Sequence, residues 1–145
     1  MMNISRYKII AVGKIKKKWI QEGIDMYLKR LPGLEVIEIK DNTRIKEEQT
    51  IKELINKNEI IVTLNEKGHS FTSKQIATKL LNSHNQNITF VIGGPSGLTT
   101  SLESSASWQL SLSPLTFPHE LARLLLIEQI YRAKNISQAG PYHKD

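Results

Sequence analysis

Two loops hold the residues best suited to binding a ligand. The first, residues 93–97, is a Gly-Gly-Pro-Ser-Gly turn that follows the apolar run 88–92. The second, residues 113–119, follows the apolar stretch 108–112. A glycine-rich turn after a strand brings bare backbone close to a ligand, because glycine has no Cβ to block the approach. Two such loops at the same ends of two strands predict one shared pocket.

The residues of the second loop narrow the class of ligand. Pro114 and Pro118 prevent this loop from continuing a strand, which leaves backbone N–H and C=O groups free for a polar ligand. Leu112, Leu115 and Phe117 offer apolar walls, and this combination suits an adenine and a ribose. The glycine turn lacks both the Gly-Lys-Ser/Thr of a P-loop and the G-x-G-x-x-G of a dinucleotide fold. The alternative is a tight turn and a packed structural loop without a ligand.

A helix predicted at residues 118–134 carries the side chains that could do chemistry. His119 and Arg123 are one helical turn apart, so both can face one site. A lone histidine near a helix start is, however, more often structural. Glu128 and Arg132 have the i,i+4 spacing of an ion pair. The last residues, 140–145, would by default form a frayed tail.

Composition and charge limit the other kinds of site. The chain has no cysteine, which excludes disulfides, thiolate nucleophiles and zinc–thiolate sites. No metal site is expected, because no i,i+4 pair and no acidic partner at ligand spacing occurs among the histidines, which are His69, His84, His119 and His143. The net charge of +6 favours a polyanionic partner such as nucleic acid. The basic run at 14–18, before Trp19, fits either a phosphate contact or a solvated helix face.

Strands alternate with helices along the whole sequence. Strands are predicted at 7–12, 34–39, 59–64, 88–92 and 108–112, and helices at 14–31, 45–56, 72–81, 99–105 and 118–134, with a loop at 65–69. This alternation is typical of an α/β fold whose mostly parallel sheet is flanked by helices. We expect one domain over residues 1–145, because no linker interrupts a chain of this length. No stretch approaches roughly 18 continuous apolar residues and no signal peptide is recognisable, so a cytoplasmic protein without a membrane segment is expected.

Five motifs occur in an order that is specific in combination. They are Ala-Val-Gly-Lys at 11–14, Phe-Val-Ile-Gly-Gly-Pro-Ser-Gly-Leu at 90–98, Leu-Ser-Pro-Leu-Thr-Phe-Pro-His at 112–119, Leu-Ile-Glu-Gln-Ile-Tyr-Arg-Ala at 126–133 and Pro-Tyr-His-Lys at 141–144. With these motifs the chain resembles the RlmH family of the SPOUT methyltransferases over its whole length. One departure is the segment between Lys40 and Glu48, which is shorter than expected for relatives and bears on how the protein would meet a ribosome.

The resemblance implies both a fold and an activity. SPOUT domains are α/β folds with a C-terminal trefoil knot and act as homodimers, although chains in general are unknotted. In the RlmH family the knot binds S-adenosylmethionine, and the methyl group goes to N3 of a pseudouridine in 23S rRNA of the assembled ribosome. The cofactor-binding residues carried over are Leu64, Gly93, Gly94, Leu112, Ser113, Pro114, Leu115, Thr116 and Phe117. The candidates for catalysis and substrate contact are His119, Arg123, Tyr142 and His143.

The residue types indicate how such a transfer would proceed without a metal. The nucleophile is an imide nitrogen that must lose its proton, and histidine is the best base by type because its reference pKa is about 6.5. This role falls to His119. Arg123 would hold a phosphate or the anion that develops on the base. Tyr142 and His143 would come from the partner chain of a dimer if the tail has to close the site.

Two other functions fit the same sequence. One is a non-catalytic ribosome-binding or RNA-binding module, which would keep the positive charge but have no enzymatic activity. The other is a related SPOUT enzyme that acts on tRNA. The lack of an appended RNA-binding domain favours a ribosomal target. An enzyme this small would depend on its dimer surface and its charge for recognition.

Overall fold

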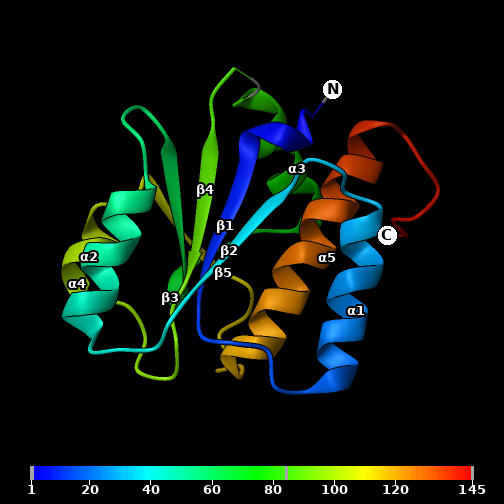
Figure 1. Cartoon of the computed structure of the whole chain (residues 1–145). Coiled ribbons are helices and arrows are strands. Elements are labelled where there is room, and N and C mark those ends of the chain that lie inside the picture. Colours follow the sequence, from blue (N-terminus) through cyan, green and yellow to red (C-terminus); the bar gives the residue numbers. More distant parts are fainter. Residues whose placement is uncertain (1, 84, 145) are drawn as a thin grey trace.

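A parallel five-stranded sheet forms the centre of the described part of the protein (Figure 1). The computed structural model describes residues 2–83 and 85–144. The sheet has the order β2-β1-β4-β3-β5, and its strands are β1 (Tyr7–Val12), β2 (Glu35–Ile39), β3 (Ile60–Ser70), β4 (Ile88–Ile92) and β5 (Trp108–Ser111). All of its strand pairs are parallel. The predicted α/β fold is confirmed, and the trefoil knot that the resemblance implies stays a prediction.

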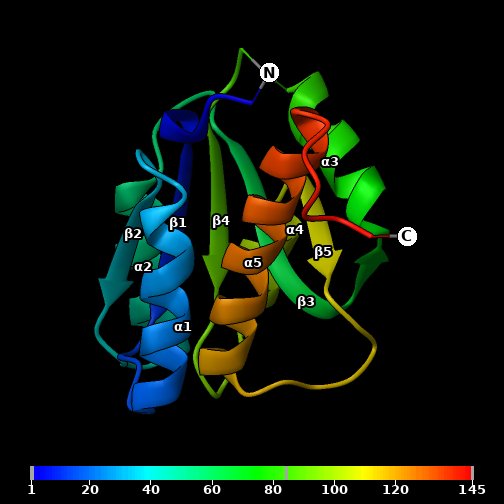
Figure 2. The same ribbon diagram turned by 90° about the vertical axis from the view of Figure 1, so that its right-hand side faces the viewer.

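Helices cover both faces of this sheet. They are α1 (Lys18–Lys29), α2 (Arg44–Leu54), α3 (Ser73–Asn82), α4 (Thr100–Ser104) and α5 (His119–Ser137), after a 3-10 turn at Ile4–Arg6. Figure 1 shows α2 and α4 on one face, and Figure 2 shows α1, α3 and α5 in front of the other. Each predicted helix is present. The first one begins at Lys18 rather than at residue 14, because residues 14–17 form a loop.

Two apolar cores, one on each face of the sheet, hold the layers together. β4 is buried along its whole length, as expected for a central strand that helices cover on both sides. Phe90 belongs to the core beneath α1, α3 and α5, and the next residue, Val91, belongs to the core beneath α2 and α4. Burial of this apolar surface is the main favourable contribution to folding.

Threonine side chains set where three of the helices begin. Thr43 caps α2 and Thr99 caps α4, each accepting a hydrogen bond from a backbone N–H of the first turn. Thr72 caps α3 in a capping box with Gln75. The prediction that α3 starts with a cap at residue 72 or 73 is confirmed.

The prediction of a loop at 65–69 is wrong, because β3 continues through this segment as a bulged strand. Leu64 and His69 both pair with Leu110 of β5, so the residues between them are looped out of the ladder. A bulge bends its strand and can aim side chains in a new direction. Here it turns the looped-out residues toward the carboxyl edge of the sheet.

Hydrogen bonds and a close backbone approach hold this bulge. Asn65 Oδ1 accepts from Lys67 N (3.0 Å), and Asn65 Nδ2 donates to Glu103 Oε2 (2.6 Å) and to Gln109 Oε1 (3.1 Å). Gly68 lies so close to β5 that a Cβ there would be 2.6 Å from Gln109 O. Asparagine and glycine are typical turn residues, which is why the segment reads as a loop in the sequence.

Replacing Gly68 by alanine should destabilise the protein. The new Cβ would clash with the backbone of β5, so we expect the free energy of unfolding to fall by about 1–3 kcal/mol. Urea unfolding followed by circular dichroism measures this change. The control is Gly23→Ala on α1, where the new Cβ would meet only the flexible end of Leu124. Equal losses in the two variants would contradict the role of Gly68.

Candidate active site

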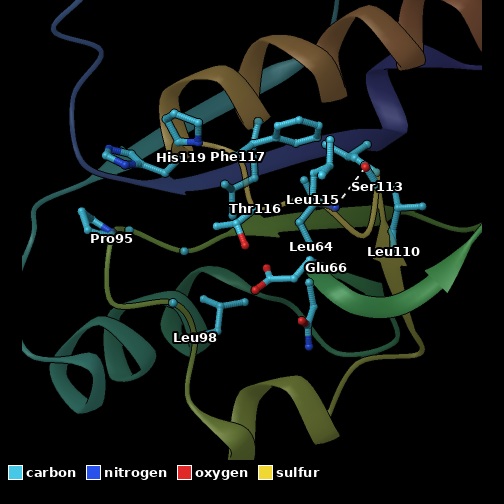
Figure 3. A pocket seen from close by; sticks show the side chains of 18 of the residues that line it. Leu64, Glu66, Pro95, Leu98, Leu110, Ser113, Leu115, Thr116, Phe117 and His119 are labelled. Atoms are coloured by element: carbon cyan, nitrogen blue, oxygen red, sulfur yellow. Dashed lines mark hydrogen bonds between the residues drawn. The ribbon is translucent and has the colours of Figure 1, made fainter.

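A cleft of about 640 Å³ opens at the carboxyl ends of β3, β4 and β5 (Figure 3). Both loops selected from the sequence line it, so the expectation that they share one pocket is confirmed. The residues of the implied cofactor set that line the cleft are Leu64, Gly93, Gly94, Leu112, Ser113, Leu115, Thr116 and Phe117. Pro114 is exposed and is not among the lining residues. The volume lies within the range of small-molecule sites, roughly 300–1,000 Å³.

The glycine turn forms one wall, and its own geometry requires glycine. Gly97 N donates to Gly94 O (2.9 Å) with Pro95 at the second position of the turn, and Gly97 has a φ of 75°. A Cβ on Gly93 would lie 2.9 Å from the carbonyl carbon of Gly97. At its three glycines this wall therefore presents peptide groups, rather than side chains, to whatever enters the cleft.

The loop after β5 forms the opposite wall. Ser111 Oγ lies 2.9 Å from Ser113 O and 3.2 Å from Glu66 O, and Ser113 Oγ accepts a hydrogen bond from Leu115 N (3.1 Å). These contacts tie the start of the loop to β3. Figure 3 shows Leu115 and Thr116 facing Glu66 across the cleft. Leu115 is 68% exposed, so its side chain offers apolar surface to a ligand.

The β3 bulge forms the floor of the cleft. Asn65 and Glu66 line it beside Leu64, and Glu66 is the only carboxylate among the lining residues of the described chain. Neither residue is expected from the sequence, where the segment reads as an ordinary loop. A signal was nevertheless available, because both residues directly follow the strand end that supplies Leu64.

His119 lies on the cleft as the first residue of α5, whereas Arg123 does not. Arg123 is 3% exposed, and its guanidinium pairs with Glu38 of β2 and donates to Gly13 O after β1 (2.8 Å). The expectation that both side chains face one site is therefore wrong within this chain. The helical spacing allows Arg123 to face the same site as His119, but the Glu38 carboxylate and the Gly13 carbonyl beside α5 bind its guanidinium instead.

A second contact from the first turn of α5 holds the connection between β1 and α1. Glu120 Oε1 accepts hydrogen bonds from Lys16 N (2.8 Å) and Lys17 N (3.1 Å). The Lys17 N–H is the largest cause of the lowered pKa of Glu120, and the Lys16 N–H and the nearby charges of His119 and Lys17 lower this pKa further. His119 therefore stands on a helical turn that is anchored through its neighbours.

The chain after α5 folds back beside that helix (Figure 2), and its residues Tyr142 and His143 contact the second half of α5. Tyr142 N donates to Asn135 Oδ1 (2.8 Å), and Tyr142 Oη donates to Glu128 Oε1 (3.2 Å). Arg132 Nη1 lies 3.1 Å from His143 Nδ1, and the Arg132 guanidinium lies 4.8 Å from the centre of the Tyr142 ring. The tail is thus bound to its own helix, and the default expectation of a frayed end is wrong for residues 140–143.

Glu128 and Arg132 form the predicted ion pair. Nε and Nη2 of Arg132 donate to Glu128 Oε1 at 2.9 and 2.6 Å. Burial is the largest cause of the raised pKa of Tyr142, and its hydrogen bond with Tyr27 (3.0 Å between the hydroxyl oxygens) raises this pKa further, as does the Glu128 carboxylate. The pair therefore also organises the tail.

The tail is too far from the cleft of its own chain to act there. Along α5, Glu128, which Tyr142 contacts, is roughly 14 Å from His119, and Arg132, which His143 contacts, is roughly 20 Å from it, at about 1.5 Å per residue. Of the four residues considered for catalysis, the structure thus brings only His119 to the cleft of the same chain. Arg123 is buried beneath α5, and Tyr142 and His143 lie along the second half of that helix, against Glu128 and Arg132.

The described residues include neither a metal-binding cluster nor a membrane-spanning helix. Within 2–83 and 85–144, no cluster of three or more His, Asp or Glu side chains is arranged to hold a metal ion. His84 lies outside the described residues. None of the described helices combines the length and the apolar character needed to cross a membrane.

The chain is similar to one family of known proteins. A family model described as "Predicted SPOUT methyltransferase" matches residues 5–143. A protein named ribosomal RNA large subunit methyltransferase H from Prochlorococcus marinus (strain NATL1A) is 81% identical over 145 residues, the full length of both chains. Its namesake from Parasynechococcus marenigrum (strain WH8102) is 54% identical over 143 residues, 99% of both chains. A solved structure of a probable methylase family protein from Haemophilus influenzae Rd KW20 shares the fold, with a TM-score of 0.65 at 11% identity over 99% of this chain and 72% of that one.

Replacing Glu120 by glutamine should destabilise the protein at neutral pH but not in acid. Because the pKa of Glu120 is lowered on folding, its carboxylate stabilises the fold fully above the unfolded pKa of about 4.3, and this stabilisation is lost as the pH falls through the folded pKa. The difference in unfolding free energy from wild type should be largest near pH 7, shrink as the pH falls below the unfolded pKa, and disappear below the lowered pKa of the folded state. Urea unfolding across this range measures it, with the exposed Glu53→Gln on α2 as control. A difference that does not change with pH would contradict the assignment.

Proposed function

Because the chain belongs to the SPOUT methyltransferase family, we propose that it transfers a methyl group from S-adenosylmethionine to N3 of a pseudouridine in 23S rRNA of the ribosome. The cleft between the two loops is the observation that carries the cofactor part of this proposal. The names of the two bacterial relatives support rRNA as the substrate, and the net charge of +6 suits a polyanion. In this proposal residues 1–145 form one catalytic domain, and the enzyme works in the cytoplasm with the ribosomes.

The cleft suits S-adenosylmethionine in size and in chemistry. Leu115 and Phe117 offer apolar surface for the adenine, and the peptide groups of Gly93 and Gly94 can meet polar atoms without a side chain in the way. The Glu66 carboxylate can accept hydrogen bonds from ribose hydroxyls or lie beside the positive sulfonium. A carboxylate on the floor would repel a phosphate, so these features favour a cationic nucleoside over a nucleotide.

His119 is the residue that can remove the N3 proton. Bound S-adenosylmethionine supplies an electrophilic methyl group. An imidazole nitrogen of His119 would accept the N3–H proton as N3 gains this methyl group. The contacts of Glu120 and Arg123 keep the helical turn of His119 in place during this transfer. Arg123 thus supports the site from beneath and does not touch the substrate.

In this proposal, Tyr142 and His143 act in the cleft of the partner chain of a homodimer. Within one chain both are bound to the second half of α5, at residues roughly 14–20 Å along the helix from His119, and neither lines its own cleft. A second copy whose tail lies at the first cleft supplies a phenol and an imidazole there. Because Arg132 and Asn135 already order the tail in each chain, less conformational entropy is lost when it enters the partner's site.

Labelled cofactor distinguishes this reaction from its rivals. We expect the purified protein to transfer the label from S-adenosylmethionine to 23S rRNA in ribosomes of a strain that lacks its gene. Nucleoside digestion should then yield N3-methylpseudouridine, and naked 23S rRNA should accept much less label. If the label appears in tRNA instead, the proposed rRNA substrate is contradicted. Calorimetry without heat on addition of S-adenosylmethionine would contradict an enzyme and favour a non-catalytic RNA-binding module.

Replacing His119 by alanine should slow methyl transfer by roughly 10²–10⁴-fold, the usual contribution of a general base. The affinity for S-adenosylmethionine should stay near that of the wild type, because the loops that form the walls of the cleft are unchanged. Single-turnover transfer to ribosomes and calorimetry measure the two quantities. His69→Ala is the matched control, since His69 is exposed and outside the cleft. Undiminished methyl transfer by the His119 variant would contradict the role of His119 as the general base.

Mixed dimers test whether the tail acts across the interface. His119→Ala and the double variant Tyr142→Ala/His143→Ala should each lose most of the transfer activity when present alone. A mixed dimer of the two has one cleft that combines an intact His119 with an intact partner tail, so coexpression should restore part of the activity. Mixed dimers that stay inactive, although each variant alone is folded and dimeric, would show that the tail does not act in this way.

A further inference from the structure

A strongly basic loop lies beside the cleft, and its lysine side chains have no role in the site described above. The connection between β1 and α1, together with the first residue of α1, carries four exposed lysines, which are Lys14, Lys16, Lys17 and Lys18. Trp19, the next residue, is 60% exposed. Figures 1 and 2 both show this connection next to the start of α5. We refer to residues 14–19 as the lysine loop.

Little in this chain neutralises the lysine loop. Among the described residues, no carboxylate forms an ion pair with Lys14, Lys16 or Lys17. Lys18 reaches Glu22 at 4.0 Å, but both side chains are exposed, and such a pair contributes little. Glu120 lies near Lys17 but its Oε1 accepts from the backbone. The like charges therefore repel one another with little compensation.

The position of these lysines also runs against the preference of a helix. Lys17 is the N-cap of α1 and makes no side-chain capping hydrogen bond, and the first turn has no acidic residue. The helix dipole disfavours cations at this end, by about 0.3–1 kcal/mol for each. A local rule broken without compensation in the fold is typical of a functional constraint.

The backbone of the lysine loop is held in place next to His119. Arg123 donates to Gly13 O at the start of the connection, and Glu120 accepts from the N–H groups of Lys16 and Lys17. Glu120 directly follows His119, which lines the cleft. The loop is therefore ordered before a ligand arrives, and ordering it on binding costs little entropy.

We propose that the lysine loop binds the phosphate backbone of the RNA substrate beside the nucleotide that enters the cleft. This inference rests on the proposed function, since it takes the substrate of the cleft to be RNA. Lysine ammonium groups bind phosphates as point charges without reading sequence, so the loop positions the RNA while the cleft selects the nucleotide. Trp19, among these charges, can stack on an unpaired base.

The double variant Lys16→Gln/Lys17→Gln tests this surface. Binding to ribosomal large subunits that lack the modification is measured against salt concentration, with S-adenosylhomocysteine present. Each lost phosphate contact should lower the slope of log K against log salt by about 1, and the affinity should fall by about an order of magnitude. The affinity for S-adenosylmethionine should not change, because neither lysine lines the cleft.

Lys29→Gln/Lys57→Gln is the matched control. It removes the same charge from exposed lysines at the opposite ends of the strands and should leave binding unchanged. Equal losses in both double variants would overturn the proposal, as would unchanged binding of the Lys16/Lys17 variant or its conversion from dimer to monomer in gel filtration. If the wild-type protein binds large subunits through these lysines but transfers no methyl group, the RNA-binding role of the lysine loop is supported and the proposed methyltransferase activity is contradicted.

Discussion

The ion pair between the buried Arg123 and the partly exposed Glu38 fixes the start of α5 to the edge strand β2, and both the cleft and the lysine loop depend on the position of that helix end. The guanidinium is almost fully removed from water, and this cost is offset by Glu38 and by the carbonyl of Gly13. Its Nε has no hydrogen-bond partner among the described residues, so the contact is not optimised for stability alone. We interpret it as a device that gives the start of α5 one position, and with it His119.

The local sequence pattern was sufficient to predict those elements whose position is decided by burial of an apolar run or by a helix cap. β4 could be predicted to the residue, because an uninterrupted apolar run ends in glycines. The start of α3 could be predicted because Thr72 caps it. The bulge in β3 could not, since Asn65 and Gly68 have the same residue types as a surface turn, and only contact with β5 decides between the two.

The candidate site likewise has features that the sequence predicts and features that depend on contacts between distant residues. Parallel strands bring their carboxyl ends together, so the shared cleft follows from the order of strands and loops. The direction of Arg123 does not follow, because its partner Glu38 is 85 positions away in sequence and no local pattern encodes their meeting. Likewise, the i,i+4 spacing predicts the pair of Glu128 and Arg132 but not that the pair also holds the tail.

The raised pKa of Tyr142 restricts what the two tail side chains can do. A partly buried phenol beside a carboxylate keeps its proton at neutral pH, so it donates a hydrogen bond and does not act as a base. Its one O–H already donates to Glu128, so in this position the hydroxyl offers a substrate only an oxygen lone pair, as an acceptor.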